Sequence, residues 1–168
     1  MVTTEQLVAL TGRDLKLDRA RLSDIPQIHA MVNRFADRGE MLHRSLSELY
    51  ENTRDFTVVR EGDRTLACAS LHVIWEDLAE IRSVAVSEEL QSHGLGGLLV
   101  RHCIEEARNL GLPRVFLLTH KPGYYERLGF KRTEVSSFPR KVWSDCIRCP
   151  KFSACNEIAL SMDLTPQS

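Results

Sequence analysis

The sequence predicts a single α/β domain, in which helices flank a central mixed β-sheet. Three observations carry this prediction. The chain has 168 residues, enough for one hydrophobic core. Hydrophobic residues make up 43% and charged residues 27%, as in ordinary soluble globular domains. Helical and strand patterns follow one another in the order ααβββαβαββ, without a linker. We expect residues 1–16 to form an N-terminal leader, flexible or a short helix, and residues 17–168 to form the domain.

Two helices are expected ahead of the first strand. The run that begins at Ser23 offers an N-cap and then a proline in the first turn. The second helix begins at Ser45, where Glu48 three residues later completes a capping box. Apolar side chains recur at helical spacing in the first helix until Gly39 ends it: Ile25, Ile28, Val32 and Phe35.

Strands and helices alternate through the rest of the chain. Residues 56–60 and 65–75 are expected to pair as a hairpin around Gly62, with a third strand at 80–86. A long amphipathic helix follows at about 94–110, with these side chains toward the core: Leu95, Leu98, Leu99, Cys103, Ala107 and Leu110. The remaining predicted elements are a buried strand at 114–118, a short helix at 122–128 and strands at 130–135 and 157–164.

Charge and hydropathy exclude several classes of protein. The formal net charge is −1 and no run of Lys and Arg reaches five, which argues against nucleic acid as a partner. No apolar run approaches the roughly 20 residues that span a bilayer, so no membrane association is expected. The N-terminal residues have no apolar signal-peptide region, and the cysteine count is odd. We therefore expect a cytoplasmic protein in a reducing compartment.

The strongest local pattern is a glycine-rich loop between a strand and the long helix. Gly94, Gly96 and Gly97 stand at the mouth of that helix. Glycines there let the backbone approach a ligand closely, and a helix N-terminus carries partial positive charge. The segment is therefore a candidate phosphate or pyrophosphate site, and the alternative is a turn that only connects strand to helix. A Walker loop is excluded because no Gly-Lys-Ser/Thr follows.

Two motifs resemble those of the GNAT N-acetyltransferases. Gln91-Ser92-His93-Gly94-Leu95-Gly96 resembles the family's Gln/Arg-x-x-Gly-x-Gly/Ala pyrophosphate loop, and Tyr125-Glu126-Arg127-Leu128-Gly129-Phe130 resembles its Tyr-x-x-x-Gly-Phe segment. Ser83-Val84-Ala85-Val86 is similar to the strand that binds the pantetheine arm. The resemblance covers about residues 17–164. It implies the GNAT acyl-CoA N-acyltransferase fold and acetyl-CoA as co-substrate, bound by Val84, Ala85, Val86, Gln91, Ser92, His93, Gly94, Leu95, Gly96 and Gly97.

Acetyl transfer needs a base for the amine, a donor to the thioester carbonyl and an acid for the leaving thiolate. The resemblance implies that Tyr125 is the acid, although a tyrosine on a short helix can simply pack. Alternation along the predicted strand places Glu80, Arg82 and Val84 on one face, and Glu80 is the candidate base. The alternative for Glu80 is a solvated surface carboxylate. The backbone N–H near Val84 is the candidate oxyanion donor.

Within the family, the chain most resembles the short, stand-alone amino-acid N-acetyltransferases of the N-acetylglutamate synthase type, which begin arginine biosynthesis. The likeness rests on residues 41–45, 66–72, 80–86 and 115–119. It implies glutamate as acceptor, and two carboxylates need cationic or strong donor groups. The candidates are Arg44, His72 and Arg82, each of which could instead be a surface charge or a structural pair.

Other readings stay open at this stage. The acceptor could be a protein N-terminus, a lysine, a polyamine or a drug, and the chain could be an acetyl-CoA-binding regulatory module without turnover. Several synthases have Phe at the position of Tyr125, and the longer ones carry an amino-acid-kinase-like domain that is absent here, so feedback by arginine cannot be assumed. Relatives are commonly dimers, which leaves a homodimer open.

Three cysteines near the C-terminus form an unexplained cluster. Cys146 and Cys149 have Cys-x-x-Cys spacing, and Cys155 follows six residues later. The set can supply three ligands to a structural zinc, but no second Cys-x-x-Cys and no nearby His completes it. Free or redox-active thiols and an internal disulfide are the alternatives.

Overall fold

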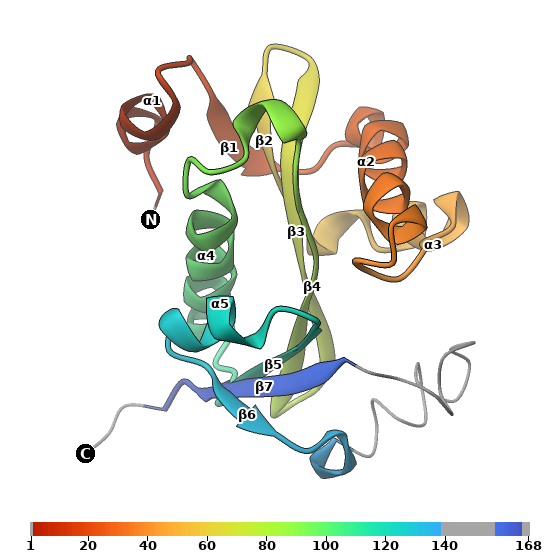
Figure 1. The fold of residues 1–168 in the computed structure, drawn as a ribbon, viewed down its shortest axis with the longest axis vertical. Helices are drawn as coiled ribbons and strands as arrows, with labels where there is room; N and C mark the ends of the chain where they lie inside the picture. The colour runs from red at the N-terminus through yellow and green to blue at the C-terminus, as the bar shows by residue number, and fades with distance from the viewer. Residues whose placement is uncertain (1, 139–156, 166–168) are drawn as a thin grey trace. The chain divides into compact units, whose positions relative to one another are not determined.

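The computed structural model describes residues 2–138 and 157–165 (Figure 1). These residues fall into two compact units. The first unit holds the residues up to 72 together with 81–106, and the second holds 73–80 together with those from 107 onward. The boundary predicted between residues 16 and 17 stays a prediction, although helix and strand already occur within 4–19.

Secondary structure follows the predicted order, with one strand added at the start. The α-helices are α1 (Thr4–Thr11), α2 (Ile25–Asp37), α3 (Leu46–Glu51), α4 (Leu95–Asn109) and α5 (Pro122–Arg127). The strands are β1 (Lys16–Arg19), β2 (Phe56–Glu61), β3 (Arg64–Trp75), β4 (Leu78–Val86), β5 (Arg114–Thr119), β6 (Lys131–Thr133) and β7 (Ile158–Asp163). Short 3-10 helices are η1 (Leu22–Asp24), η2 (Thr53–Asp55), η3 (Glu88–Leu90) and η4 (Val135–Ser137).

The described strands form a mixed sheet in the order β1-β2-β3-β4-β5-β7-β6. β1, β2 and β3 are antiparallel neighbours, and β7 is antiparallel to both β5 and β6. β4 pairs in parallel with β5 at Ala79–Val115 and Glu80–Phe116. The predicted fold class, a mixed sheet flanked by helices, is confirmed.

Local signals placed most helix ends correctly. At α3, the backbone N–H of Glu48 donates to the Ser45 hydroxyl at 3.1 Å, as the capping-box pattern predicts. Asp24 rather than Ser23 is the N-cap residue of α2, because η1 precedes that helix directly. The prediction for Leu110 was wrong. Its side chain is 61% exposed because α4 ends at Asn109, one residue before it.

Each unit has its own apolar core. In the first unit, α2 and α3 pack on one side of strands β2 and β3, and α4 lies on the other (Figure 1). Ile28 and Val32 of α2 and Cys68 of β3 are fully buried there. In the second unit, the rings of Phe116 and Phe138 stack with centroids 4.4 Å apart.

A buried ion pair ties the start of α2 to the sheet of the first unit. The Arg60 guanidinium on β2 donates to both carboxylate oxygens of Asp24, at 2.8 and 2.7 Å, and to Asp18 on β1 at 3.0 Å. The Thr65 hydroxyl and the Arg21 backbone N–H also donate to Asp24, at 2.7 and 2.6 Å. Every oxygen of this buried carboxylate therefore has a donor, the condition under which a buried pair is tolerated.

Replacing Arg60 is expected to destabilise the fold strongly. Arg60→Ala leaves the buried Asp24 carboxylate without its main partner, so we expect a loss of about 3–5 kcal/mol in the free energy of unfolding. Urea denaturation followed by circular dichroism measures the change. Arg21→Ala, which removes only an exposed pair with Asp18 at 3.4 Å, is the control. Its expected effect is about 0.5 kcal/mol or less, and equal losses in the two variants would contradict this role for Arg60.

Asp24 also predicts how stability depends on pH. Burial opposes ionisation of Asp24, but hydrogen bonds from Arg60, the Arg21 N–H and Thr65 outweigh it and lower its pKa from 3.8 to about 2. A carboxyl whose folded-state pKa is depressed stabilises the fold above its unfolded pKa. This stabilisation, about 2 kcal/mol, is expected to disappear as pH falls from about 4 to about 2. Unfolding free energies of wild type and Asp24→Asn across that range should converge at the acid end; parallel curves would contradict the assignment.

Candidate functional site

The glycine-rich loop has a backbone shaped by two left-handed residues. Ser92 and Gly94 have φ of +69° and +79°, and the intervening His93 is exposed. The Leu98 N–H donates to the Gly94 carbonyl at 3.1 Å, so α4 begins directly after the turn. A left-handed serine is uncommon and strained, and such residues cluster where backbone geometry serves a ligand. The loop therefore presents backbone N–H groups at a helix N-terminus, the arrangement that binds phosphate.

The strand ahead of the loop has a second left-handed residue. Ser83, inside β4, has φ of +54°. The Cys68 thiol of β3 donates to the Ser83 carbonyl at 3.4 Å, and the Ser87 N–H donates to the Leu66 carbonyl at 2.8 Å. This turn interrupts the regular pleat, so alternation alone does not show that Val84 shares a face with Glu80.

The loop is preceded by two carboxylates that are paired with arginines. Glu89 binds Arg13 at 2.9 Å and Arg64 at 2.7 Å, and Glu88 binds Arg38. These hydrogen bonds lower the pKa of both Glu88 and Glu89. Unpaired carboxylates here would repel a pyrophosphate, and the arginines offset that charge.

Arg44 is a half-buried candidate for acceptor binding, and its backbone is fixed from α2. The Asn33 side chain accepts from the Arg44 N–H at 2.9 Å and donates to the Arg44 carbonyl at 2.8 Å. These two hydrogen bonds fix the backbone of Arg44. Arg82, on β4, is also half-buried.

His72 has a partner that changes its predicted role. Its Nδ1 lies 2.7 Å from Oδ2 of Asp55, and both side chains are about a quarter exposed, at 28% and 26%. A carboxylate on one ring nitrogen fixes the orientation of the imidazole. Asp55 already occupies this ring nitrogen, so Nδ1 of His72 is not available to a substrate carboxylate.

Glu80 and Tyr125 belong to the second unit. Glu80 is buried, with 3% of its surface exposed, rather than solvated on the strand surface. Tyr125 is half-buried, and its ring meets Phe130 edge-on with centroids 6.1 Å apart. Gly129 has φ of +104°, and a Cβ there would lie 3.2 Å from Cε of Met162 on β7, so glycine suits this position in the Tyr-x-x-x-Gly-Phe segment.

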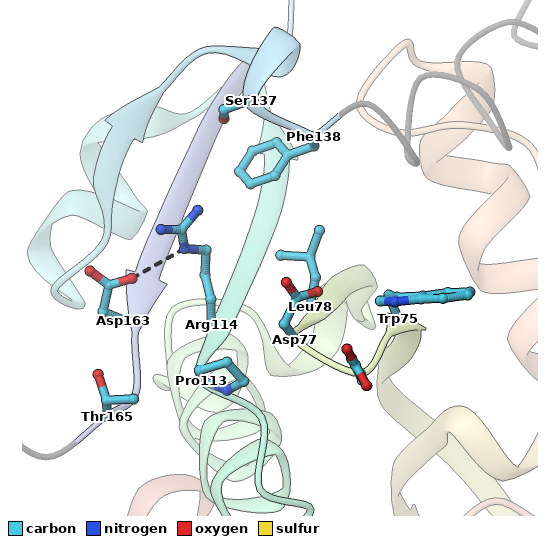
Figure 2. A pocket seen from close by; sticks show the side chains of 10 residues that line it. Trp75, Asp77, Leu78, Pro113, Arg114, Ser137, Phe138, Asp163 and Thr165 are labelled. Atoms are coloured by element: carbon cyan, nitrogen blue, oxygen red, sulfur yellow. Dashed lines mark hydrogen bonds and ion pairs between the residues drawn. The ribbon is translucent and has the colours of Figure 1, made fainter.

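The second unit also contains a hollow of about 700 Å³ (Figure 2). Among the described residues, carboxylates dominate its charged lining, and Arg114 pairs with Asp163 at 3.2 Å. An acceptor with two carboxylates would be repelled there, so we do not place the acceptor in it. Neither Glu80 nor Tyr125 lines this hollow. The lining residues are Trp75, Glu76, Asp77, Leu78, Pro113, Arg114, Ser137, Phe138, Asp163 and Thr165.

The metal prediction gains no support. Within residues 2–138 and 157–165, no group of three or more His, Cys, Asp or Glu side chains could hold a metal ion. Cys146, Cys149 and Cys155 lie outside the described residues. In the same described ranges, no helix has the length and apolar character needed to cross a membrane.

Comparison with known proteins identifies the family. The acetyltransferase (GNAT) family model matches residues 23–130. An uncharacterised N-acetyltransferase of Chlorobaculum tepidum is 39% identical over 151 residues, which are 90% of this chain and 97% of that one. An amino-acid acetyltransferase of Mycobacterium tuberculosis is 37% identical over 133 residues, 77% of this chain and 76% of its own. The chain therefore belongs to the GNAT family of acetyltransferases.

A solved structure extends the likeness. N-acetylglutamate synthase from Neisseria gonorrhoeae, complexed with coenzyme A and N-acetyl-glutamate, superposes with a TM-score of 0.79 and 26% identity. The match covers 90% of this chain and 35% of the synthase. The predicted family and fold are thus confirmed, and the roles of individual residues stay predictions.

Sequence reasoning missed several residues around the site. Arg13 and Leu10 lie in the segment expected to be a leader, and Asn33 and Asp55 carry no motif. The one sequence signal for Asn33 is its polar side chain within an amphipathic helix.

The loop geometry predicts the effect of a methyl group at Gly94. Gly94→Ala forces alanine to φ of +79° in the candidate pyrophosphate loop, so we expect about a tenfold rise in KM for acetyl-CoA. Gly39→Ala is a matched control, because Gly39 has φ of +75° and open space around it but lies after α2. Both variants should lose about 1 kcal/mol of stability, and only the first should change KM in steady-state kinetics. Equal KM values for acetyl-CoA in Gly94→Ala and Gly39→Ala would contradict a role of the loop in binding acetyl-CoA.

Proposed function

We propose that this acetyltransferase transfers the acetyl group of acetyl-CoA to the α-amine of L-glutamate, forming N-acetylglutamate for arginine biosynthesis. The observation that carries the proposal is the half-buried Arg44, whose backbone is held by the Asn33 side chain. Arg44 belongs to the same unit as the glycine-rich loop and Arg82. Two cationic side chains match the two carboxylates of glutamate. The relative of Mycobacterium tuberculosis named as an amino-acid acetyltransferase and the Neisseria gonorrhoeae synthase bound to N-acetyl-glutamate support the same acceptor.

In the proposed reaction, the neutral amine of glutamate attacks the thioester carbon directly. The buried Glu80 accepts the amine proton, directly or through water. The N–H near Val84 donates to the developing oxyanion. The C–S bond then breaks, and Tyr125 gives the CoA thiolate its proton.

The roles on the acceptor side follow from charge. Arg44 and Arg82 bind the two carboxylates, and His72, paired with Asp55, orients the acceptor rather than neutralising it. The nucleotide end of acetyl-CoA binds Gln91–Gly97 by its pyrophosphate, and the pantetheine arm follows Val84, Ala85 and Val86. The protein is proposed to act in the cytoplasm.

The first experiment measures CoA release from acetyl-CoA with a panel of acceptors in reducing buffer. We expect L-glutamate to exceed aspartate, glutamine, a polyamine and a basic peptide by at least about tenfold in kcat/KM, since each lacks a carboxylate or its correct position. CoA release with another amine but not with glutamate would refute glutamate as the acceptor and identify that amine instead. Bound acetyl-CoA without release for any amine would favour a regulatory module.

Variants separate acceptor binding from chemistry. Arg44→Ala and Arg82→Ala should raise KM for glutamate by about tenfold or more with KM for acetyl-CoA unchanged, because each removes a charge-assisted contact. Arg101→Ala, an exposed site on α4, is the control. Glu80→Gln should lower kcat by about 10²-fold, because it removes the proposed proton acceptor. Unchanged rates in both Glu80→Gln and Tyr125→Phe would refute both catalytic assignments.

A further inference from the structure

Helix α1 lies against the glycine-rich loop Gln91–Gly97, although this helix precedes the region that the family model matches. A methyl group added to Gly94 would lie 4.0 Å from Cδ2 of Leu10, so this leucine borders the loop at ordinary contact distance. Leu10 is 41% exposed, which leaves part of its side chain open beside the loop. The matched family region begins only at residue 23.

Arg13 fastens the end of α1 to the segment that leads into the loop. Its guanidinium donates twice to Glu61 of the β2–β3 hairpin, at 2.8 and 2.7 Å, and once to Glu89 of η3, at 2.9 Å. Gly12 ends α1 in a left-handed conformation, and the Arg13 N–H donates to the Thr11 hydroxyl at 3.2 Å. The direction in which Arg13 leaves the helix is therefore set by the helix cap.

The rest of α1 is a capped helix with a buried side. Thr3 and Gln6 form a reciprocal capping box, at 3.2 and 2.9 Å. Leu7 and the following Leu15 are fully buried. Because Leu7 and Leu15 are buried and Arg13 binds Glu61 and Glu89, the helix has a fixed place beside Gly94.

We propose that α1 forms part of the acetyl-CoA site, with Leu10 contacting the nucleotide end of the cofactor and Arg13 positioning η3 and the loop. The inference rests on the proposed function, since it needs acetyl-CoA at Gln91–Gly97. Together with Arg64, Arg13 also offsets the negative charge of Glu89, which would otherwise repel the pyrophosphate more strongly. Its role is positioning, whereas Leu10 touches the cofactor.

The chain offers a matched pair of variants to test this. Val8 lies on the same helix and is 42% exposed, but it is two residues, about 200° of helical rotation, away from Leu10. Leu10→Asp places a carboxylate beside the loop, and Val8→Asp places the same charge on another face. Any loss of helix stability affects both, so melting temperatures should fall alike.

Titration calorimetry with CoA measures the effect without any acceptor. Leu10→Asp should weaken CoA binding about fivefold to tenfold through apposed negative charge, and Val8→Asp should stay within about twofold. Kinetics with S-acetylpantetheine, which lacks the nucleotide and pyrophosphate, should show no difference between the two variants. Equal CoA affinities, or an equal loss with S-acetylpantetheine, would overturn the assignment of Leu10.

Arg13 is tested separately. Arg13→Ala should raise KM for acetyl-CoA about threefold with kcat unchanged, and Arg13→Lys should recover part of the loss because it keeps the charge near Glu89. A fall in kcat alone, or no change in KM, would overturn the positioning role. Failure of wild-type protein to bind CoA would instead refute the proposed function, and this inference with it. Binding by wild type and by all variants alike would refute only this inference.

Discussion

The buried pair between Asp24 and Arg60 is the constraint on which the proposed acceptor side of the first unit depends. It joins β1, β2 and the first residue before α2 in one hydrogen-bonded cluster. With the start of α2 fixed, Asn33 on the same helix comes to hold both backbone groups of Arg44. Burying a charged pair costs desolvation energy, so the pair adds little net stability compared with apolar residues in its place. Its role here is to fix the start of α2 relative to β1 and β2.

The proposed cofactor side of the same unit depends on a balance of charge. Two glutamates stand directly before the loop that we propose binds the acetyl-CoA pyrophosphate, and they would weaken binding of an anion if they were free. Arg13, Arg38 and Arg64 approach them from three separate segments of the chain. These ion pairs are exposed, and each adds little to folding stability. They act mainly on the electrostatic potential near the glycine-rich loop and on the position of that loop.

Features set by neighbouring residues could be predicted from the sequence. The capping box of α3, the turn at Gly62 and the glycine-rich start of α4 each depend on residues a few positions apart. Strand β1 could not be predicted, since its Lys-Leu-Asp-Arg sequence has no apolar alternation and gains its place from pairing with β2. The left-handed backbone of Ser83 has no signature either. Contacts such as Arg13 with Glu89, 76 positions apart, depend on the folded chain.

A crystal structure of the protein with CoA and N-acetylglutamate tests the central claim most directly. The account predicts pyrophosphate oxygens on the backbone N–H groups of Gln91–Gly97, the nucleotide against Leu10 and the two carboxylates of N-acetylglutamate on Arg44 and Arg82. CoA bound elsewhere would contradict the site. N-acetylglutamate absent, or held without either arginine, would contradict glutamate as the acceptor.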